Sequence, residues 1–479
     1  MMVINETSQP IELLVAVDRY RSRTLGAQIE DQLRRAIRDG ALRPGATLPS
    51  TRDLARQITV SRRVVVDAYA QLAAEGYLSL RQGARPRVSA AAVLAGEPEA
   101  VASRPAPRAR FDFRPSVPDV SAFPRAAWLR SLREALATIT DADLGYGDPR
   151  GVEALRCALA DYLGRVRGVV ADPEHIIITS GYTQGLGLVC HALAAAGTKR
   201  MALEDPSNPE DRLIVARAGL APIAIGVDEA GTQVDDLDRA DADAVVLTPA
   251  HQHPTGVVLS GGRRTALLAW LRARDAIAIE DDYDAEYRFD RAAIGALQGL
   301  DPGRVIYAGS ASKTLAPALR IGWLVVPPSL LEAVTHEKLL ADRGTSRIEQ
   351  HALADFLTRG ELDRHLRRMR TRYRGRRDAL VEALTVTLPE ASVGGVAAGL
   401  HVTLQLPDSD SEQAIREEAN HRNIELETMN DYRPGARSRP PTLLLGYGQM
   451  PEHAIRAGVR ELAIAVRAAR TRTTGISSA

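Results

Sequence analysis

The spacing of hydrophobic residues divides the chain into two regions with different patterns. In the first region, apolar positions recur every three to four residues over 24–38, 51–58 and 62–75, which predicts three amphipathic helices. Two short alternating segments follow, 77–80 and 85–88, and they predict a pair of strands. Three helices followed by a hairpin have the plan of a winged helix-turn-helix.

Beyond Phe111, continuous apolar segments alternate with amphipathic helices. Strands that are apolar throughout are buried on both faces, so this pattern favours an α/β fold with a mostly parallel sheet between two layers of helices. Ligands of such sheets bind in the loops that follow the carboxyl ends of the strands. The segments predicted to be strands are 176–179, 200–203, 222–226, 244–248, 276–280, 305–308 and 322–326.

A third kind of segment separates the two patterns. Residues 89–110 are rich in Ala, Pro, Glu and Arg and show no periodicity, which is typical of a linker. We therefore expect a winged-helix domain over 1–88, a linker over 89–110 and an α/β domain over 111–479.

The composition is that of a globular protein, with 45% hydrophobic and 25% charged residues and a net charge of +1. This balance excludes a uniformly basic nucleic-acid coat, but residues 1–88 hold 14 Arg against 9 Asp and Glu. No run approaches the roughly 20 apolar residues that cross a bilayer. The two cysteines cannot make a disulfide framework, so we expect a cytoplasmic protein without a membrane partner.

Basic residues lie where a winged helix-turn-helix meets DNA. Arg62 and Arg63 open the third predicted helix, at the end that a recognition helix points into the major groove. Ser61 precedes them as the N-cap, and Arg52 opens the second helix. A helical bundle with solvated arginines explains any one of these positions. The joint pattern of turn, caps and charges favours DNA binding.

The segment after strand 305–308 combines groups that bind a phosphate and an aldehyde. Ser310 and Ser312 lie in a turn, Lys313 ends it and Arg320 follows. Small hydroxyls and an arginine suit a phosphate, and a lysine forms an imine with an aldehyde. Pyridoxal 5'-phosphate (PLP) carries both groups. A surface lysine in an ordinary turn is the alternative, although only three of the 61 basic residues are Lys.

The loop after strand 176–179 offers an anion cradle. Gly181, Tyr182 and Thr183 open a helix there, and the free N–H groups at a helix start bind anions. Ordinary turn chemistry explains the same residues. In the loop after strand 244–248, His251 and His253 allow a metal site, but the Pro and Gly that follow indicate a shaped turn.

The loop after strand 276–280 carries acidic residues. Asp281 is placed to keep a pyridine nitrogen protonated, and the phenol of Tyr283 suits a ring hydroxyl. A solvated acidic turn or a magnesium site is the alternative reading. Both residues precede Lys313 by one strand–helix–strand step, so a shared site is expected.

Longer motifs carry a resemblance to known families. The segment GALRPGATLPSTRDLARQITVSRRVVVDAYAQLAAEGYL resembles the GntR family of winged-helix regulators. The motifs YGDPRG, TSGYTQGL, TPAHQHPTG, EDDYDAEYRF and SASKTLAPALRIGW follow the order and spacing of fold-type-I aminotransferases. Together they resemble the MocR/GabR-type regulators, in which a GntR winged helix precedes an aminotransferase-like domain with a small C-terminal α+β subdomain.

That resemblance assigns roles to the residues above. It implies PLP bound as an internal aldimine on Lys313, with Asp281 on the pyridine nitrogen and Tyr283 on the ring hydroxyl. His253 replaces the Asn of the aminotransferase NPTG motif and would take over a contact to that hydroxyl. The phosphate ligands would be Gly181, Tyr182, Thr183, Ser310, Ser312 and Arg320. The DNA contacts would be Arg52, Ser61, Arg62, Arg63 and the wing residue Gly83.

Three departures from the family pattern affect these roles. Asn208 stands where the family has an aromatic residue that stacks on the pyridine ring, which leaves Tyr182 as a possible substitute. The stretch 440–447 lacks the arginine that holds a substrate carboxylate, so Arg433, Arg437 or Arg439 would have to reach in. The wing also lacks the usual G-x-G-T.

The resemblance implies a PLP-dependent transcriptional regulator that senses an amine, an amino acid or PLP itself. Its partners would be a double-stranded DNA operator and a second copy in a domain-swapped homodimer. A working aminotransferase with an appended DNA-binding domain is the alternative. A large domain that only dimerises, without cofactor, is a third reading.

Overall fold

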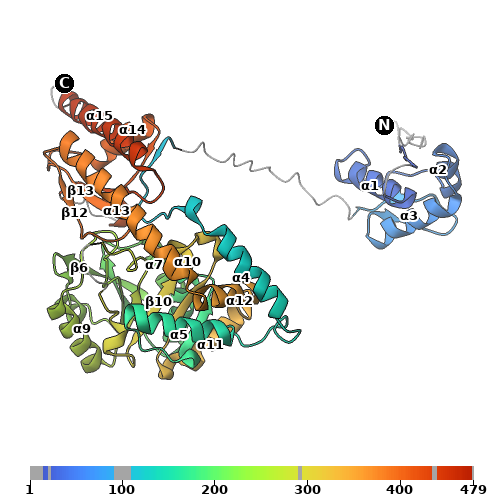
Figure 1. The fold of residues 1–479 in the computed structure, drawn as a ribbon. Helices are drawn as coiled ribbons and strands as arrows, with labels where there is room; N and C mark the ends of the chain where they lie inside the picture. Colours follow the sequence, from blue (N-terminus) through green and yellow to red (C-terminus); the bar gives the residue numbers. More distant parts are fainter. Residues whose placement is uncertain (1–14, 20–22, 91–108, 290–293, 434–439, 477–479) are drawn as a thin grey trace. The chain divides into compact units, whose positions relative to one another are not determined.

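The computed structural model describes residues 15–19, 23–90, 109–289, 294–433 and 440–476. The chain divides into two compact units, Met1–Pro107 and Arg108–Ala479. Figure 1 draws both units, and each is described by itself below. No helix in the described part of the chain is long and apolar enough to span a membrane.

The first unit is a winged helix-turn-helix, as the periodicity predicts. Its apolar positions meet in one core that includes Ile29, Leu33 and Leu72. Arg34 Nη2 lies 2.8 Å from Glu75 Oε2 and ties the first helix to the end of the third. The elements are α1 (Leu25–Arg38), α2 (Thr51–Gln57), α3 (Arg62–Ala74), β1 (Leu78–Ser79) and β2 (Arg87–Val88), with the two strands antiparallel.

The second unit is built on an eight-stranded sheet of order β4-β11-β10-β9-β8-β5-β6-β7. Strands β10, β9, β8, β5 and β6 run parallel, whereas β11 and β7 are antiparallel to their neighbours. The prediction of a mostly parallel sheet is confirmed. The strands are β4 (Ile176–Thr179), β5 (Arg200–Asp205), β6 (Ala221–Asp228), β7 (Gly231–Thr232), β8 (Ala244–Leu247), β9 (Ile277–Asp281), β10 (Val305–Ser310) and β11 (Gly322–Val325).

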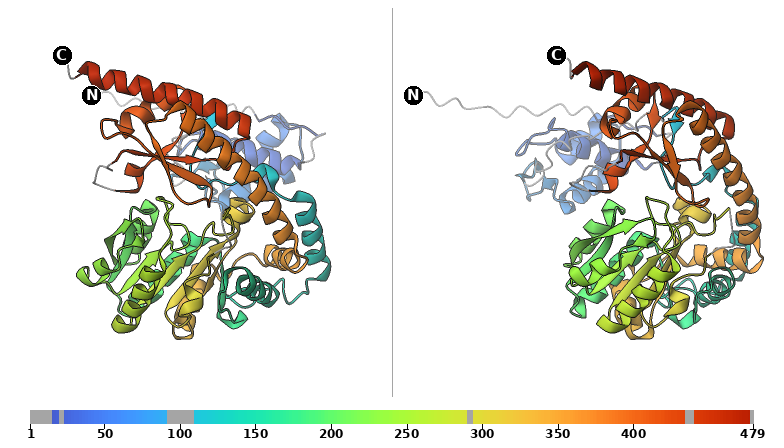
Figure 2. Two further views of the ribbon diagram at one scale, coloured as in Figure 1. Left: turned by 60° about the vertical axis from the view of Figure 1, so that its left-hand side comes forward. Right: turned by 90° about the vertical axis from the view of Figure 1, so that its left-hand side faces the viewer.

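Helices cover both faces of this sheet (Figure 2), and alternating side chains of the strands pack against them. In β8, Val246 belongs to the cluster under α6 and α7, whereas Val245 and Leu247 belong to the cluster under α9. The covering helices are α4 (Arg125–Thr138), α5 (Glu153–Arg167), α6 (Tyr182–Ala195), α7 (Pro209–Arg217), α8 (Asp235–Arg239), α9 (Gly261–Arg274), α11 (Pro328–Asp342) and α12 (Arg347–Thr358).

A smaller antiparallel sheet of order β12-β13-β16-β15 forms a C-terminal subdomain. The long helix α13 (Glu361–Thr387) packs against α12 beside the large sheet and against α15 of the subdomain, and so connects the two. The subdomain consists of β12 (Ser392–Gly394), β13 (His401–Gln405), α14 (Glu412–His421), β14 (Ile424–Glu425), β15 (Glu427–Thr428), β16 (Thr442–Gly446) and α15 (Glu452–Ile476).

The second unit begins inside this subdomain. Strand β3 (Phe111–Asp112) pairs in parallel with β14, and Phe113 N donates to Glu425 O at 2.8 Å. Three residues later the chain reaches Ser116, a buried residue with a left-handed backbone φ of 59°. The described part of the unit also contains short helical turns η2 (Val120–Ala122), η3 (Pro173–His175), η4 (Gln298–Leu300), α10 (Ala311–Thr314), η5 (Pro317–Leu319) and η6 (Met429–Tyr432).

Candidate functional site

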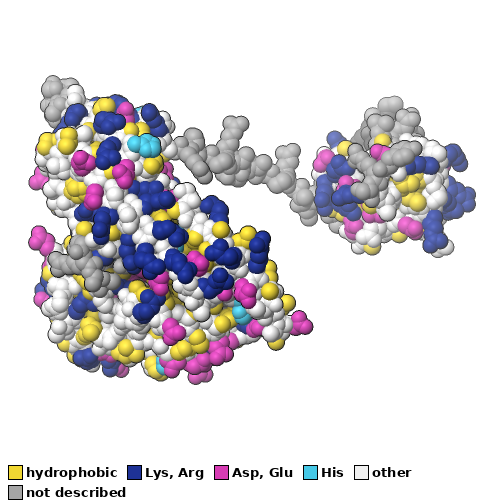
Figure 3. Space-filling view, in the orientation of Figure 1, with side chains coloured by type: hydrophobic (Ala, Val, Ile, Leu, Met, Phe, Trp, Pro, Cys, Tyr) yellow, Lys and Arg dark blue, Asp and Glu magenta, His cyan; other side chains and the backbone are white. Residues whose placement is uncertain are grey.

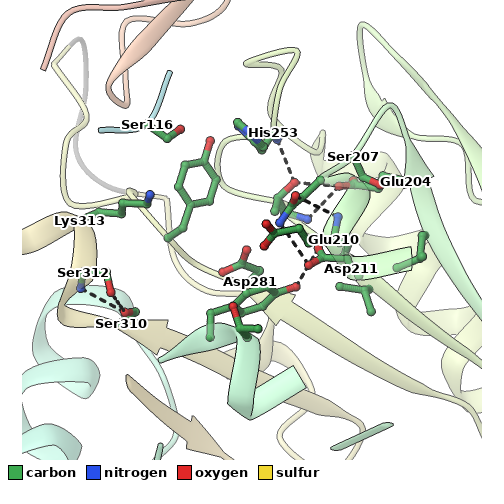
Figure 4. A pocket seen from close by; sticks show the side chains of 18 of the residues that line it. Ser116, Glu204, Ser207, Glu210, Asp211, His253, Asp281, Ser310, Ser312 and Lys313 are labelled. Carbon is green, nitrogen blue, oxygen red and sulfur yellow. Dashed lines mark hydrogen bonds between the residues drawn. The ribbon is translucent and has the colours of Figure 1, made fainter. Parts of the chain in front are cut away.

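A cavity opens beyond the carboxyl ends of β5, β8 and β9, where a parallel sheet places its ligands. Figure 4 shows Lys313 on one side of it, and Asp281 and Asp211 on the other. The structure thus brings together candidates from four separate loops. The predicted cofactor residues that line the cavity are Tyr182, Thr183, His253, Asp281, Tyr283, Ser310, Ser312, Lys313 and Arg320.

Ser310, Ser312 and Arg320 line one end of the cavity, and Gly181 lies behind Arg320; we call these four residues the anion cradle. Ser310 caps α10, because its Oγ accepts from Ser312 N at 3.1 Å, and the two hydroxyl oxygens lie 2.9 Å apart. Arg320 ends η5 in a left-handed conformation, with φ 52°. Among the described residues no carboxylate pairs with its guanidinium, so the charge is available to a ligand.

Gly181 does not line the cavity but closes the cradle from behind. It is the N-cap of the 14-residue helix α6, with φ 108°, a conformation that side-chain-bearing residues rarely adopt. A Cβ at this position would lie 3.2 Å from Arg320 Nη2. Glycine therefore lets the guanidinium approach the start of the helix, where free N–H groups point outward. The cradle fits a phosphate group.

The amine of Lys313 is suited to nucleophilic chemistry. Burial lowers the pKa of Lys313, while the carboxylates of Asp284, Asp281 and Glu427 partly oppose the shift. A lowered pKa increases the neutral fraction of the amine, and only the neutral amine attacks a carbonyl. Within the described residues its Nζ has no hydrogen-bond partner, so nothing holds it away from the cavity.

Asp281 and Tyr283 face the cavity from the end of β9. Burial raises the pKa of Asp281 well above its usual range, and the neighbouring carboxylates of Asp211, Asp282 and Asp284 add to the shift. A cationic group placed beside Asp281 would reverse it. The phenol oxygen of Tyr283 lies 3.0 Å from His251 Nδ1, which holds its ring at the cavity wall.

The histidines of the HxH motif separate into two roles. His251 Nδ1 lies 3.1 Å from both carboxylate oxygens of Asp284, so His251 supports Tyr283 rather than the cavity itself. His253 lines the cavity, and burial lowers its pKa well below the usual value. The His253 ring packs edge-on against the Tyr283 ring, with 5.6 Å between the ring centroids. Among the described residues, no group of three His, Cys, Asp or Glu side chains is arranged to hold a metal ion.

The wall formed by Tyr182, Asn208 and Asp211, which we call the acidic wall, was only partly foreseen. Asn208 caps α7 by accepting from Glu210 N at 3.2 Å, and its amide lies 3.4 Å from Asp211 Oδ1. Tyr182 donates to Asp211 Oδ2 at 3.1 Å. Burial raises the pKa of Asp211 to about 7. Sequence reasoning missed Asp211, because in sequence it is an ordinary acid in the first turn of a helix.

The structure offers no arginine in the strand where aminotransferases hold the substrate carboxylate. All five residues of β16 are buried, and none is an arginine. Arg433 Nε lies 4.0 Å from Asp205 Oδ1, without a hydrogen bond between them, and Arg433 does not line the cavity. Arg437 and Arg439 lie outside the described residues.

The predicted DNA-contact residues are all exposed in the first unit. Arg52, Ser61, Arg62 and Arg63 are all exposed at the starts of α2 and α3. Ser61 holds the N-cap position, although its side chain makes no capping bond. Gly83 is exposed with φ 78°, a left-handed conformation that glycine adopts without strain and that turns the wing.

Two family models match the chain. One describes bacterial regulatory proteins of the gntR family and covers residues 25–88. The other describes aminotransferases of class I and II and covers residues 119–424. Among solved structures, the chain is similar to a multiple substrate aminotransferase from Thermococcus profundus, with a TM-score of 0.69 and 25% identity over 76% of this chain and 92% of that one.

Curated relatives match both units at once. The pyridoxine biosynthesis regulator PdxR of Corynebacterium glutamicum is 33% identical over 95% of this chain and 99% of its own length. The probable rhizopine catabolism regulator MocR of Rhizobium meliloti is 32% identical over 94% and 95%. The chain therefore belongs to the MocR-type transcriptional regulators of the GntR family, which join a DNA-binding winged helix to a fold-type-I aminotransferase-like domain.

Proposed function

We propose that this regulator holds PLP covalently on Lys313 and changes its DNA binding in response to an amine, an amino acid or PLP itself. The observation that carries the proposal is that one cavity contains an amine of lowered pKa, a buried carboxylate and an anion cradle. When bound, PLP supplies an aldehyde that condenses with primary amines and a pyridine ring that withdraws electrons.

In this proposal each end of the cavity holds one part of the cofactor. The hydroxyls of Ser310 and Ser312, the start of α6 and the Arg320 guanidinium bind the phosphate. Asp281 holds a proton on the pyridine nitrogen, which also removes the penalty for its own buried charge. Tyr283 and His253 would contact the ring hydroxyl from the loops that follow β9 and β8.

The effector site is proposed on the side of the cavity near Lys313. An aminotransferase substrate is gripped by its carboxylate, and β16 offers no arginine for this purpose. Arg433 is a poor replacement, because it does not line the cavity. Binding of an effector without steady turnover is the expected behaviour.

Reduction with borohydride tests the covalent attachment. The chain has three lysines, and the described contacts separate them sharply. Lys338 Nζ is held by Gln184, Asp342 and Thr345 at 2.8–2.9 Å, and Lys199 is exposed. Peptide mass spectrometry after reduction should find the pyridoxyl mass on Lys313 alone, and on no peptide of Lys313→Ala. Labelling of Lys199 instead would show only adventitious reaction.

The second candidate function is a working aminotransferase, which the match to the aminotransferase family model and to solved aminotransferases favours. Steady transfer of an amino group to a keto acid, abolished by Lys313→Ala, would establish it. A spectral change that saturates with amine but gives no keto-acid product supports the regulatory reading.

The proposal also includes assembly of two copies of the chain. We expect a domain-swapped homodimer that reads paired DNA half-sites, since winged helices of this family act in pairs. Leu144 and Tyr146 are 61% and 79% exposed, which is unusual for large apolar side chains and consistent with a partner copy covering them. Sedimentation of the wild type against Tyr146→Ser measures this directly.

A further inference from the structure

We propose that the effector is a diamine, which condenses with PLP through one amine and is recognised at its second ammonium by the carboxylate of Glu427. Glu427 would act on the effector only with PLP bound on Lys313, so the assignment rests on the proposed function. The exchange of one amine for another at the aldehyde oxidises and reduces nothing. The incoming ammonium passes two protons to the nitrogen of Lys313, which leaves as an ammonium in its turn.

The cavity has no cation to spare for an effector carboxylate. Its lining contains two Lys or Arg side chains, Lys313 and Arg320, and the proposed cofactor occupies both. Figure 3 shows Lys and Arg side chains spread over a face of the second unit, so such residues are abundant on its surface. An effector that carried a carboxylate would meet like charge in the cavity. The carboxylates of the lining belong to Glu204, Glu210, Asp211 and Asp281.

The small subdomain brings a further carboxylate toward the cavity. Glu427 of β15 lies directly opposite Leu444 of β16, and directly opposite residues of antiparallel strands share one face of the sheet. Leu444 packs against Tyr432, whereas its two neighbours in β16 belong to the main core. The ring centroid of Tyr432 lies 5.0 Å from that of His253, which lines the cavity. Glu427 is therefore on the face of the small sheet that is turned toward the cavity.

The carboxylate of Glu427 is available to a ligand. One of its oxygens, Oε2, accepts a hydrogen bond from the Tyr432 hydroxyl, and the other has no partner among the residues that the structure describes. The two arginines nearby, Arg114 and Arg416, pair with other carboxylates. Burial raises the pKa of Glu427, and a cation beside it would reverse this shift.

Glu427 also has the right place relative to the amine that the effector replaces. Three carboxylates lie close enough to Lys313 to oppose the lowering of its pKa, those of Asp284, Asp281 and Glu427. Asp284 is already bonded to an imidazole, and Asp281 is assigned to the pyridine nitrogen. Glu427 remains, opposite the strand in which aminotransferases carry the arginine that holds a carboxylate. The charge at this place is thus inverted, which favours an ammonium.

Titration of the full-length protein loaded with PLP tests the class of effector. Three probes of equal length differ in the group at the far end, which is an ammonium in putrescine, a methyl group in n-butylamine and a carboxylate in γ-aminobutyrate. Half-saturation of the absorbance change should need about tenfold less putrescine than n-butylamine, because hydrogen bonds to charged groups are strong. This difference exceeds the statistical advantage of two equivalent amines. γ-Aminobutyrate should bind most weakly.

Variants of Glu427 separate recognition from folding. E427Q should abolish the preference for putrescine over n-butylamine. E427K should reverse the order, so that γ-aminobutyrate binds more tightly than putrescine, a gain that a misfolded protein cannot produce. E417Q removes an exposed carboxylate from α14 of the same subdomain and should keep the order of the wild type.

Three results would overturn the assignment of Glu427. They are equal binding of putrescine and n-butylamine by the wild type, tighter binding of γ-aminobutyrate than of putrescine by the wild type, and an unchanged preference in E427Q. Each would leave the proposed function standing as long as borohydride still attaches the pyridoxyl group to Lys313. Loss of that label would overturn the proposed function as well.

Discussion

The two ends of the cofactor cavity follow the family pattern to different degrees. The anion cradle combines four of the predicted groups, with Gly181 behind, two serines at the start of α10 and an arginine that no described carboxylate neutralises. The acidic wall departs from the pattern, because Asn208 and Asp211 replace an aromatic surface with polar groups that bond to each other and to Tyr182. With PLP bound as proposed, the cradle would supply most of the affinity and the acidic wall would hold the ring less firmly.

The largest effect is expected at the cradle. Arg320→Gln removes the charge that faces the phosphate, and hydrogen bonds to charged groups contribute about 1.5–3 kcal/mol, so PLP should bind roughly 10- to 150-fold more weakly. Arg320→Lys keeps a point charge but loses the planar fork, and an intermediate loss is expected. Absorbance titration of the apo-protein with PLP measures both. An unchanged affinity of Arg320→Gln for PLP would mean that Arg320 does not bind the phosphate.

A pair of glycines in α6 tests the shape of the cradle. Gly181→Ala strains a backbone with φ 108° and pushes a Cβ to within 3.2 Å of Arg320 Nη2. Strain of this kind costs about 1–3 kcal/mol, and PLP affinity should fall in step. Gly187→Ala is the control, since its Cβ would meet nothing nearer than Ile214 Cγ2 at 3.9 Å. Equal affinity in the two variants would contradict the role given to Gly181.

A smaller change of opposite sign is expected at the acidic wall. Asn208→Tyr restores the aromatic residue of the family pattern, and stacking contributes about 0.5–1.5 kcal/mol, so PLP should bind about two- to twelvefold more tightly. The cap of α7 is lost at the same time, so a melting curve of the apo-protein is needed beside the titration. Weaker PLP binding at an unchanged melting temperature would mean that Tyr182 already occupies the stacking position.

The acidic wall also predicts a pH dependence of stability. Burial raises the pKa of Asp211 from 3.8 to about 7, so the folded protein binds this proton more tightly than the unfolded chain does. The contribution to stability is complete below pH 3.8 and is lost as pH rises through about 7. Melting temperatures of the apo-protein across this window should fall less steeply in Asp211→Asn, with the exposed Glu229→Gln as the control for net charge. Parallel curves of melting temperature against pH for the wild type and Asp211→Asn would show that Asp211 does not cause the pH dependence.

Periodicity and motifs predicted the parts of the fold that are locally encoded. Each continuous apolar run, such as 176–179 and 244–248, became a strand of the large sheet, because a segment that is apolar on both faces is stable only between two layers. The two-residue strands β3 and β14 gave no such signal. They are too short for a pattern, and their pairing depends on residues more than 300 positions apart.

The site shows the same limit. Lys313 and Asp281 were found because each follows a strand whose end could be placed. His401, in contrast, belongs to β13 of the small subdomain. Its ring centroid lies 5.4 Å from the ring centroids of both His251 and His253. The contact between Tyr182 and Asp211 likewise exists only because α6 and α7 lie side by side. Spacing along the chain cannot signal contacts that the packing of separate elements creates.

At the start of the second unit, a short stretch of chain connects the small subdomain with the cavity wall. Strand β3, at the start of the second unit, pairs with β14 of the small subdomain, and Ser116 of the cavity wall follows within five residues of Phe111. Five residues span at most about 18 Å of extended chain. A displacement of Ser116 or a tilt of the small subdomain therefore moves the first described residues of the second unit as well.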